Sequence, residues 1–168
     1  MKSILYRLQF ASSLTKIPIL KYNQSRNPMT YRRYHGSCHC QAVQYEAEFD
    51  LAAGSNRCNC SLCSKARAWF LFVRGDKFKL LAGDDVLSTY QWVPPGRAES
   101  GLTYRFCSRC GIRLYATGEL AQLGGRFYAI HVPTLDDVDR EELVRAPLNF
   151  VDNAHDRPDR APADARLM

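Results

Sequence analysis

The chain has 168 residues, of which 46% are hydrophobic and 24% are charged, and its formal net charge at pH 7 is +6. This length suits one domain with a hydrophobic core and tails. The longest apolar run, residues 68–73, is far too short to cross a bilayer, so neither a transmembrane helix nor a membrane partner is expected.

The basic charge is concentrated at one end. Seven Lys and Arg precede Glu46, the first acidic residue, and the remaining 16 basic and 17 acidic residues nearly cancel. A nucleic-acid partner is therefore not expected.

Residues 1–33 are expected to form a poorly ordered basic extension ahead of the main domain. Residues 1–28 contain four serines and no acidic side chain, a composition compatible with an organelle transit peptide. The moderate arginine content favours a frayed leader, or an alternative start at Met29, over a targeting signal. We therefore expect a cytoplasmic protein, with mitochondrial targeting as the open alternative.

Alternating hydrophobic residues predict a mostly β domain of short antiparallel strands over residues 34–150. In the first strand the alternation with polar neighbours places one face inward, formed by Val43, Tyr45, Ala47 and Phe49. Further strands are predicted at residues 68–73, 78–81, 87–92, 103–106, 112–116 and 127–131. Turn signals separate them at residues 74–76, 83–85 and 94–96.

One short helix is predicted, over residues 135–144. Thr134 would cap its N-terminus, and Asp136 and Asp137 would complement the helix dipole in its first turn. Residues 151–168 contain two prolines and many charges, and we expect them to form an exposed, irregular tail.

Seven cysteines in three tight groups are the most specific feature of the sequence. Their spacings are C-x-C, C-x-C-x-x-C and C-x-x-C, formed by Cys38 and Cys40, by Cys58, Cys60 and Cys63, and by Cys107 and Cys110. Zinc takes four thiolates in a closed structural site, or three plus an exchangeable ligand in a reactive one. Disulfides are disfavoured by the odd cysteine number, the lack of a recognisable signal-peptide pattern and the strain across C-x-C. We therefore expect two Zn²⁺ ions, one structural and one open.

The grouping of the ligands follows in part from their spacing. A single loop can aim Cys58, Cys60 and Cys63 at one ion because they lie within two turns of chain. The other four cysteines would join an early and a late segment through a structural zinc, whose binding energy becomes folding energy, on the order of 10 kcal/mol in small zinc peptides. Spacing alone leaves mixed groupings open, such as Cys63 with Cys107 and Cys110.

Three motifs resemble those of one family, which contains glutathione-dependent formaldehyde-activating enzymes and centromere protein V. The motifs are G-S-C-H-C at residues 36–40, C-N-C-S-L-C at 58–63 and F-C-S-R-C-G at 106–111. The resemblance covers about residues 34–147 and implies a β-tent fold with two zinc sites. It implies a structural ion on Cys38, Cys40, Cys107 and Cys110, and a second ion on Cys58, Cys60 and Cys63. Gln41 and Ile112 stand where the family usually has glycine and threonine, and neither change removes a ligand.

The resemblance also implies an activity, that of a carbon–sulfur lyase that reversibly joins glutathione to formaldehyde to give S-hydroxymethylglutathione. A metal deprotonates a coordinating thiol, so glutathione could occupy the open position as a thiolate. Beside an aldehyde carbon this thiolate would add to give a hemithioacetal. The predicted catalytic residues are therefore Cys58, Cys60 and Cys63, and the predicted partners are a small-molecule thiol and an aldehyde. The sequence leaves the oligomeric state undetermined.

Other polar residues are weaker candidates for the site. His39 lies between two expected ligands, and a residue in that position usually points away from the ion. Arginine suits bidentate recognition of the carboxylates of glutathione, although most such side chains are solvated or paired. The arginines concerned are Arg67, Arg97 and Arg105.

Aromatic residues near the motifs are expected in the core more than in a cleft. This applies to Trp69, Phe70 and Trp92, which lie on strand patterns. His131 follows an apolar run and is expected to be a sheet residue with its hydrogen bonds satisfied, and not a general base.

Two other classes of function stay open. In a non-catalytic zinc module, a fourth protein ligand would close the second site or the site would lack an adjoining cleft, and the surface would bind a protein partner. Chromatin association, by analogy with centromere protein V, would need a basic face on the folded domain, and the charge distribution disfavours one.

Overall fold

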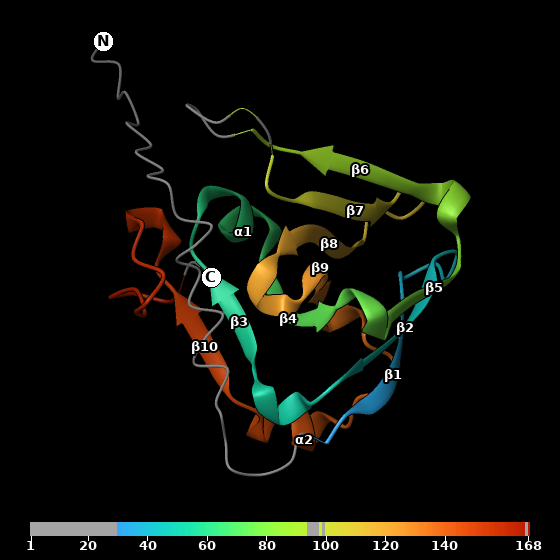
Figure 1. Cartoon of the computed structure of the whole chain (residues 1–168), viewed down its shortest axis with the longest axis horizontal. Coiled ribbons are helices and arrows are strands. Elements are labelled where there is room, and N and C mark those ends of the chain that lie inside the picture. Colours follow the sequence, from blue (N-terminus) through green and yellow to red (C-terminus); the bar gives the residue numbers. More distant parts are fainter. Residues whose placement is uncertain (1–29, 94–97, 99, 167) are drawn as a thin grey trace.

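The computed structural model describes residues 30–93, 98, 100–166 and 168. The predicted basic extension up to residue 29, the predicted turn at residues 94–96 and Arg97 lie outside the described residues. In the part of the chain that is described, strands predominate and form two sheets (Figure 1). This confirms the mostly β fold class.

The smaller sheet contains three antiparallel strands in the order β1-β2-β5. They are β1 (Arg32–Ser37), β2 (Gln44–Phe49) and β5 (Phe78–Ala82). Every second residue of β2 is buried, as the alternation in the sequence predicted. Strand β1 was not predicted, because Tyr34 is its one large apolar residue.

The larger sheet has seven strands in the order β10-β3-β4-β9-β8-β7-β6. Their bounds are β3 Ser55–Cys58, β4 Trp69–Arg74, β6 Leu87–Gln91, β7 Thr103–Cys107, β8 Arg113–Leu120, β9 Gly125–His131 and β10 Leu148–Val151. Predictions for five of these strands are confirmed, with bounds shifted by a few residues, whereas β3 and β10 were missed. The prediction of purely antiparallel pairing is wrong for this last pair, because β10 runs parallel to β3.

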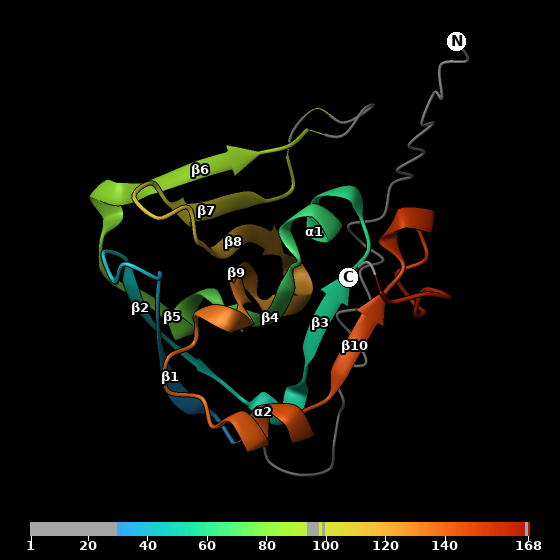
Figure 2. The ribbon, with the colours of Figure 1, turned by 180° about the vertical axis from the view of Figure 1, so that it is seen from behind.

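The two sheets lean together like the slopes of a tent (Figures 1 and 2). Strands β1 and β2 form one slope, and β3 and β10 form the other. The slopes approach each other where β2 leads through a short 3-10 turn, Leu51–Ala53, into β3. The predicted β-tent arrangement is therefore found.

Two short α-helices occur in the described residues, where the sequence predicted one. They are α1 (Ser61–Ala66) and α2 (Arg140–Arg145). Further 3-10 turns connect the strands, at Gly75–Lys77, Asp84–Val86, Ala121–Leu123, Val132–Thr134 and Asn153–His155. Helix α1 was missed because it is only six residues long and lies inside a cysteine motif.

The helix predicted over residues 135–144 begins five residues later, and its predicted cap is wrong. Asp139 is the cap, and its carboxylate accepts a hydrogen bond from the backbone N–H of Glu142 at 2.7 Å. The residues before Asp139 pair with β1 instead of forming the start of the helix. The N–H of Asp136 donates to the carbonyl of His35 at 2.9 Å, and Leu135 forms a bridge with Gly36. Tertiary pairing thus holds this segment extended.

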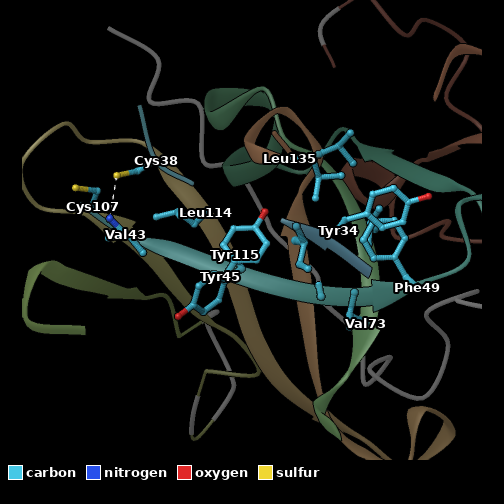
Figure 3. Close-up of a cluster of buried hydrophobic side chains, with 14 of the residues drawn as sticks. Tyr34, Cys38, Val43, Tyr45, Phe49, Val73, Cys107, Leu114, Tyr115 and Leu135 are labelled. Atoms are coloured by element: carbon cyan, nitrogen blue, oxygen red, sulfur yellow. Dashed lines mark hydrogen bonds between the residues drawn. The ribbon is translucent and has the colours of Figure 1, made fainter. Parts of the chain in front are cut away.

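The core lies between the two sheets and is rich in aromatic side chains (Figure 3). Tyr34 stacks on Phe49 with ring centroids 4.4 Å apart. The hydroxyl of Thr134 donates to the carbonyl of His131 at 2.7 Å, so the buried Tyr45 hydroxyl must donate in turn to Thr134 Oγ1, also at 2.7 Å. The buried Tyr45 thus keeps its one polar atom bonded.

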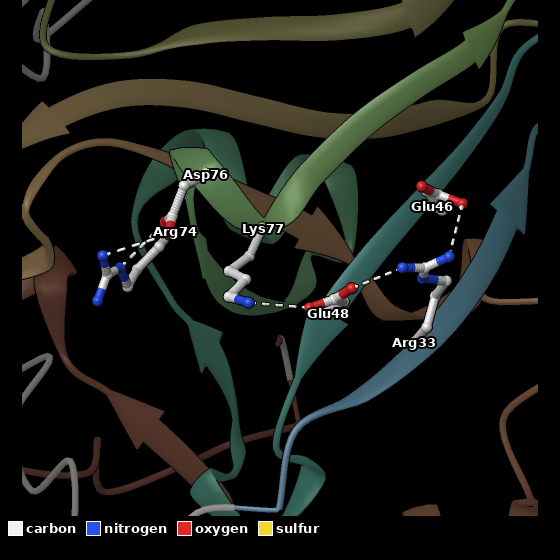
Figure 4. Close-up of polar contacts among 6 residues, drawn as sticks. All are labelled: Arg33, Glu46, Glu48, Arg74, Asp76 and Lys77. Atoms are coloured by element: carbon white, nitrogen blue, oxygen red, sulfur yellow. Dashed lines mark hydrogen bonds and ion pairs between the residues drawn. The ribbon is translucent and has the colours of Figure 1, made fainter.

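Charged side chains cover the outer face of the smaller sheet (Figure 4). Glu48 accepts hydrogen bonds from Arg33 and from Lys77, each at 2.9 Å. These contacts lower the pKa of Glu48, with the bond from Lys77 as the main cause. Because all three groups are solvent-accessible, the pairs contribute little to stability and mainly keep this face polar.

The C-terminal residues depart in part from the exposed, irregular tail that the sequence predicted. Asp152 and Met168 are only 4% and 5% exposed. Arg57 donates a hydrogen bond to the carbonyl of Met168 at 2.8 Å, which attaches the chain end to β3. In the described part of the chain, neither helix has the length and apolar character needed to span a bilayer.

Candidate metal centres

Four cysteine sulfurs converge where the two sheets meet. The Sγ atoms of Cys38, Cys40, Cys107 and Cys110 all lie within 4.8 Å of one another. Two short turns carry them, the first directly after β1 and the second directly after β7. This four-cysteine group therefore connects the smaller sheet to the larger one.

Backbone hydrogen bonds shape both turns. In the first, the N–H of Cys38 donates to the carbonyl of Val43 at 3.1 Å, and the N–H of Val43 donates to Cys38 Sγ at 3.3 Å. In the second, the N–H of Cys107 donates to the carbonyl of Ile112 at 2.9 Å. Gln41 adopts a left-handed conformation in the first turn, with φ of 58°. Glycine would meet this requirement with less strain than glutamine.

The other three sulfurs lie on one loop at the end of β3. Cys58 is the last residue of this strand, Cys60 is the N-cap of α1, and Cys63 lies in the first turn of α1. Their Sγ atoms lie within 4.8 Å of one another. Cys63 therefore groups with Cys58 and Cys60, and not with Cys107 or Cys110. We call these residues the three-cysteine group.

Close packing of the three thiols makes their ionisation unequal. Hydrogen bonds from the thiols of Cys58 and Cys63 lower the pKa of Cys60 to about 3. The same contacts, with Cys58 as the main cause, raise the pKa of Cys63. Three thiolates this close need a bound cation to offset their repulsion. An all-sulfur set of this size suits a soft, borderline ion such as Zn²⁺, so the residues fit the predicted metal.

Tyr104 lies close to the three-cysteine group, and Arg113 lies against Tyr104. Burial raises the pKa of the Tyr104 hydroxyl, and Cys63 would raise it further when ionised. The guanidinium of Arg113 lies over the Tyr104 ring, 4.1 Å from its centroid. Sequence reasoning missed both residues, because β7 and β8 come close to the α1 loop only in the folded chain.

The polar residues suggested by the sequence occupy different places. His39 is exposed and belongs to neither sulfur group. Arg67 is exposed at the end of α1, where its left-handed backbone, with φ of 48°, caps the helix. Arg105 is half-buried on β7.

The aromatic candidates also divide. Trp69 packs against the core, and its indole N–H donates to Ser55 Oγ at 2.7 Å. Phe70 packs beside the three-cysteine group, whereas Trp92 is 44% exposed. His131 is half-buried in β9, as expected, but the prediction that its hydrogen bonds are satisfied is wrong, because its buried Nε2 has no partner among the described residues. A groove of about 830 Å³ lies beside β4 and β10, and its lining includes none of the seven cysteines.

The fold and its two sulfur groups define a thiol-rich β protein with two candidate metal sites. A family model described as glutathione-dependent formaldehyde-activating enzyme matches residues 33–150. The chain belongs to this family.

Two relatives accompany the family match. A curated Halomonas elongata protein, provisionally named as a glutathione-dependent formaldehyde-activating enzyme, is 34% identical over 84 residues, which is 48% of this chain and 53% of the relative. The chain thus spans about half the length of the curated relative it matches. A crystal structure of a Rhodobacter sphaeroides protein is similar with a TM-score of 0.54 and 27% identity, and the match covers 68% of this chain and 98% of that one.

Proposed function

We propose that this protein is a zinc-dependent carbon–sulfur lyase that forms and cleaves S-hydroxymethylglutathione. One observation carries the proposal. The three-cysteine group offers three sulfurs from a single loop, and among the described residues no fourth Cys, His, Asp or Glu joins them. Such a site has room for a ligand from solution. The alternative, a non-catalytic second site, predicts either that fourth protein ligand or the lack of an adjoining cleft, and the groove beside β4 and β10 is not lined by these cysteines. Family membership supports the choice of glutathione and formaldehyde as substrates.

Cys58, Cys60 and Cys63 would hold the zinc ion of this site. When bound, the ion would supply a positive charge at which a thiol loses its proton near neutral pH. The other four cysteines would hold a structural ion, because they join two sheets and lie partly in the core.

In the reaction, the glutathione sulfur forms a bond to the carbonyl carbon of formaldehyde, and the carbonyl π electrons move to oxygen. The resulting alkoxide takes up the proton that the thiol released, so the adduct contains all atoms of both substrates. The chain's part is to orient the two reactants and to stabilise the developing negative charge. Arg113, whose guanidinium lies over the ring of Tyr104, would supply a positive charge suited to this.

The test measures how fast free formaldehyde and its glutathione adduct interconvert at equilibrium. Exchange NMR with ¹³C-formaldehyde, glutathione and zinc-loaded protein gives this rate. We expect exchange well above the uncatalysed rate. Cys60→Ser should reduce it to background, and S-methylglutathione, which has no thiol, should give no adduct. Exchange no faster than background with a fully loaded protein would overturn the proposal and favour the non-catalytic zinc module.

A further inference from the structure

We infer that residues 151–155, the C-terminal segment, position the three-cysteine group, and that Asn153 is a positioning residue for the Cys58 sulfur. This segment lies beyond the family match, which ends at residue 150. The inference rests on the metal-binding part of the proposed function and needs none of its lyase chemistry.

The C-terminal segment is attached to the loop that carries the cysteines. Asn59, between two of the three cysteines, donates its backbone N–H to the carbonyl of Val151 at 3.2 Å. Its side-chain Nδ2 donates to Asp152 Oδ1 at 2.5 Å, and its Oδ1 accepts from the N–H of Ala154 at 2.8 Å. Both ends of the Asn59 amide are therefore used, and their partners settle its orientation.

The segment is itself held in place. The Asp152 carboxylate is almost fully buried and also accepts a hydrogen bond from His155 Nδ1 at 2.7 Å. The backbone of Asp152 bonds to Arg160 and to Arg157, at 3.0 and 2.9 Å. Parallel pairing of β10 with β3 sets Val151 opposite Cys58. This fixed backbone brings the next side chain, Asn153, to the sulfur.

Asn153 donates its side-chain amide directly to Cys58 Sγ, with a separation of 3.3 Å between nitrogen and sulfur. A thiolate only accepts hydrogen bonds, so the NH₂ end of the amide must face it. Cys58 is 3% exposed, and water therefore cannot readily replace this donor. Partners of this kind orient a metal ligand and tune its basicity, and their loss typically costs about 10–100-fold in metal affinity.

The experiment compares metal binding by wild type, Asn153→Ala and the nearly isosteric Asn153→Asp. Each purified full-length protein is titrated with Co²⁺ against a chromophoric chelator, and the thiolate-to-cobalt charge-transfer band is recorded. We expect the three-cysteine site to bind about 10–100-fold more weakly in Asn153→Ala. Binding should be weaker still in Asn153→Asp, where a carboxylate faces the sulfur. The band of that site should also shift. The second site serves as an internal control.

Asn149→Ala is the matched control. Asn149 lies on the adjoining strand β10 and also donates its side-chain amide, but to the carbonyl of Ser55 at 3.3 Å. Its removal should leave both affinities and the band unchanged. Should Asn153→Ala misfold, the band and affinity of Asn153→Asp decide the matter.

Unchanged affinity and an unchanged band in folded Asn153→Asp would overturn the inference while leaving the proposed function standing. Wild-type protein that binds only one ion, at the four-cysteine group, would overturn both. An equal loss in Asn149→Ala would also overturn the inference, since it would show a general effect of weakening β10.

Discussion

Cys40 Sγ lies 3.7 Å from Cys107 Sγ, although 67 residues separate them in the chain. Cys40 belongs to the turn that follows β1, and Cys107 ends β7. Each strand lies in a different sheet, so these two sulfurs mark a point where the sheets are connected. The three-cysteine group spans only one loop, and the two groups should therefore respond differently to substitution.

Cys107→Ser should remove one metal ion per chain and lower the free energy of unfolding by on the order of several kcal/mol. The reason is that a metal site between distant segments contributes its binding free energy to folding. Native mass spectrometry would count the ions, and thermal unfolding followed by circular dichroism would report the stability. Cys60→Ser is the comparison, and it should lose one ion while keeping its unfolding transition close to that of wild type. Equal destabilisation by both changes would contradict the separation of roles.

Chelation should release the two ions in separate phases. The ligands of the three-cysteine group come from one loop, so that ion can leave without separating the sheets. The four-cysteine group connects the two sheets, so its ion should leave only as the fold opens. Timed mass spectra and circular dichroism during incubation with a strong chelator would distinguish the phases. Simultaneous release with loss of structure would show that the sites are not independent.

Gly36→Ala should destabilise the fold by about 1–3 kcal/mol, the usual cost of inserting a group into packed space. A Cβ at Gly36 would overlap Cζ and the hydroxyl oxygen of Tyr45 and would lie 2.7 Å from the carbonyl oxygen of Thr134. Denaturant unfolding would measure the loss. Gly124→Asn is the control, because a Cβ there meets nothing within 4 Å and asparagine tolerates the left-handed backbone. It should be close to neutral.

The stability of the protein should fall between pH 7.5 and 5.5, in part because of His131. Burial lowers the pKa of His131, the positive charge of Arg113 lowers it further, and its Nε2 has no hydrogen-bond partner in the described part of the chain. Below the unfolded pKa of about 6.5 the unfolded chain therefore binds a proton that the folded chain does not. The free energy of unfolding then decreases as pH falls, by up to about 1.4 kcal/mol per pH unit from this group.

His131→Phe should reduce that dependence on pH while changing stability at pH 7.5 much less, since the buried Nε2 has no hydrogen-bond partner that would be lost. Urea unfolding of both proteins at the two pH values would test this. An identical slope in the two proteins would assign the pH dependence to other groups.

Local pattern predicted most of the strands, and its failures have two causes. Strands with alternating hydrophobic residues, such as β2, were found from the sequence. Strand β1 was missed because it contains only one large apolar residue, although its partner β2 is the next strand along the chain. Strands β3 and β10 are short and pair with each other across most of the domain, so the local pattern does not indicate them. The helix start failed because of a contact distant in sequence, since His35 of β1 pairs with Asp136 and holds that segment extended.

The candidate site divides in a similar way. The cysteine spacing by itself indicated seven sulfur ligands in two sets, because residues one or three positions apart are brought together by local geometry. It could not indicate Tyr104 of β7, which lies close to the three-cysteine group, or Arg113 of β8, which lies against Tyr104. Nor could it indicate the bond from Asn59 to Asp152, because 93 residues separate the two.

The sequence by itself therefore determined the class of fold, the family and the sulfur atoms available to metal, all of which depend on residue type and short spacing. Only the tertiary structure decided which sheets the four-cysteine group joins and which side chains surround the three-cysteine group. It also decided that the C-terminal segment belongs to that site and is not an irregular tail throughout. The physical reason is that these contacts form between strands distant in sequence, where hydrogen bonding and burial in the assembled fold outweigh local preference.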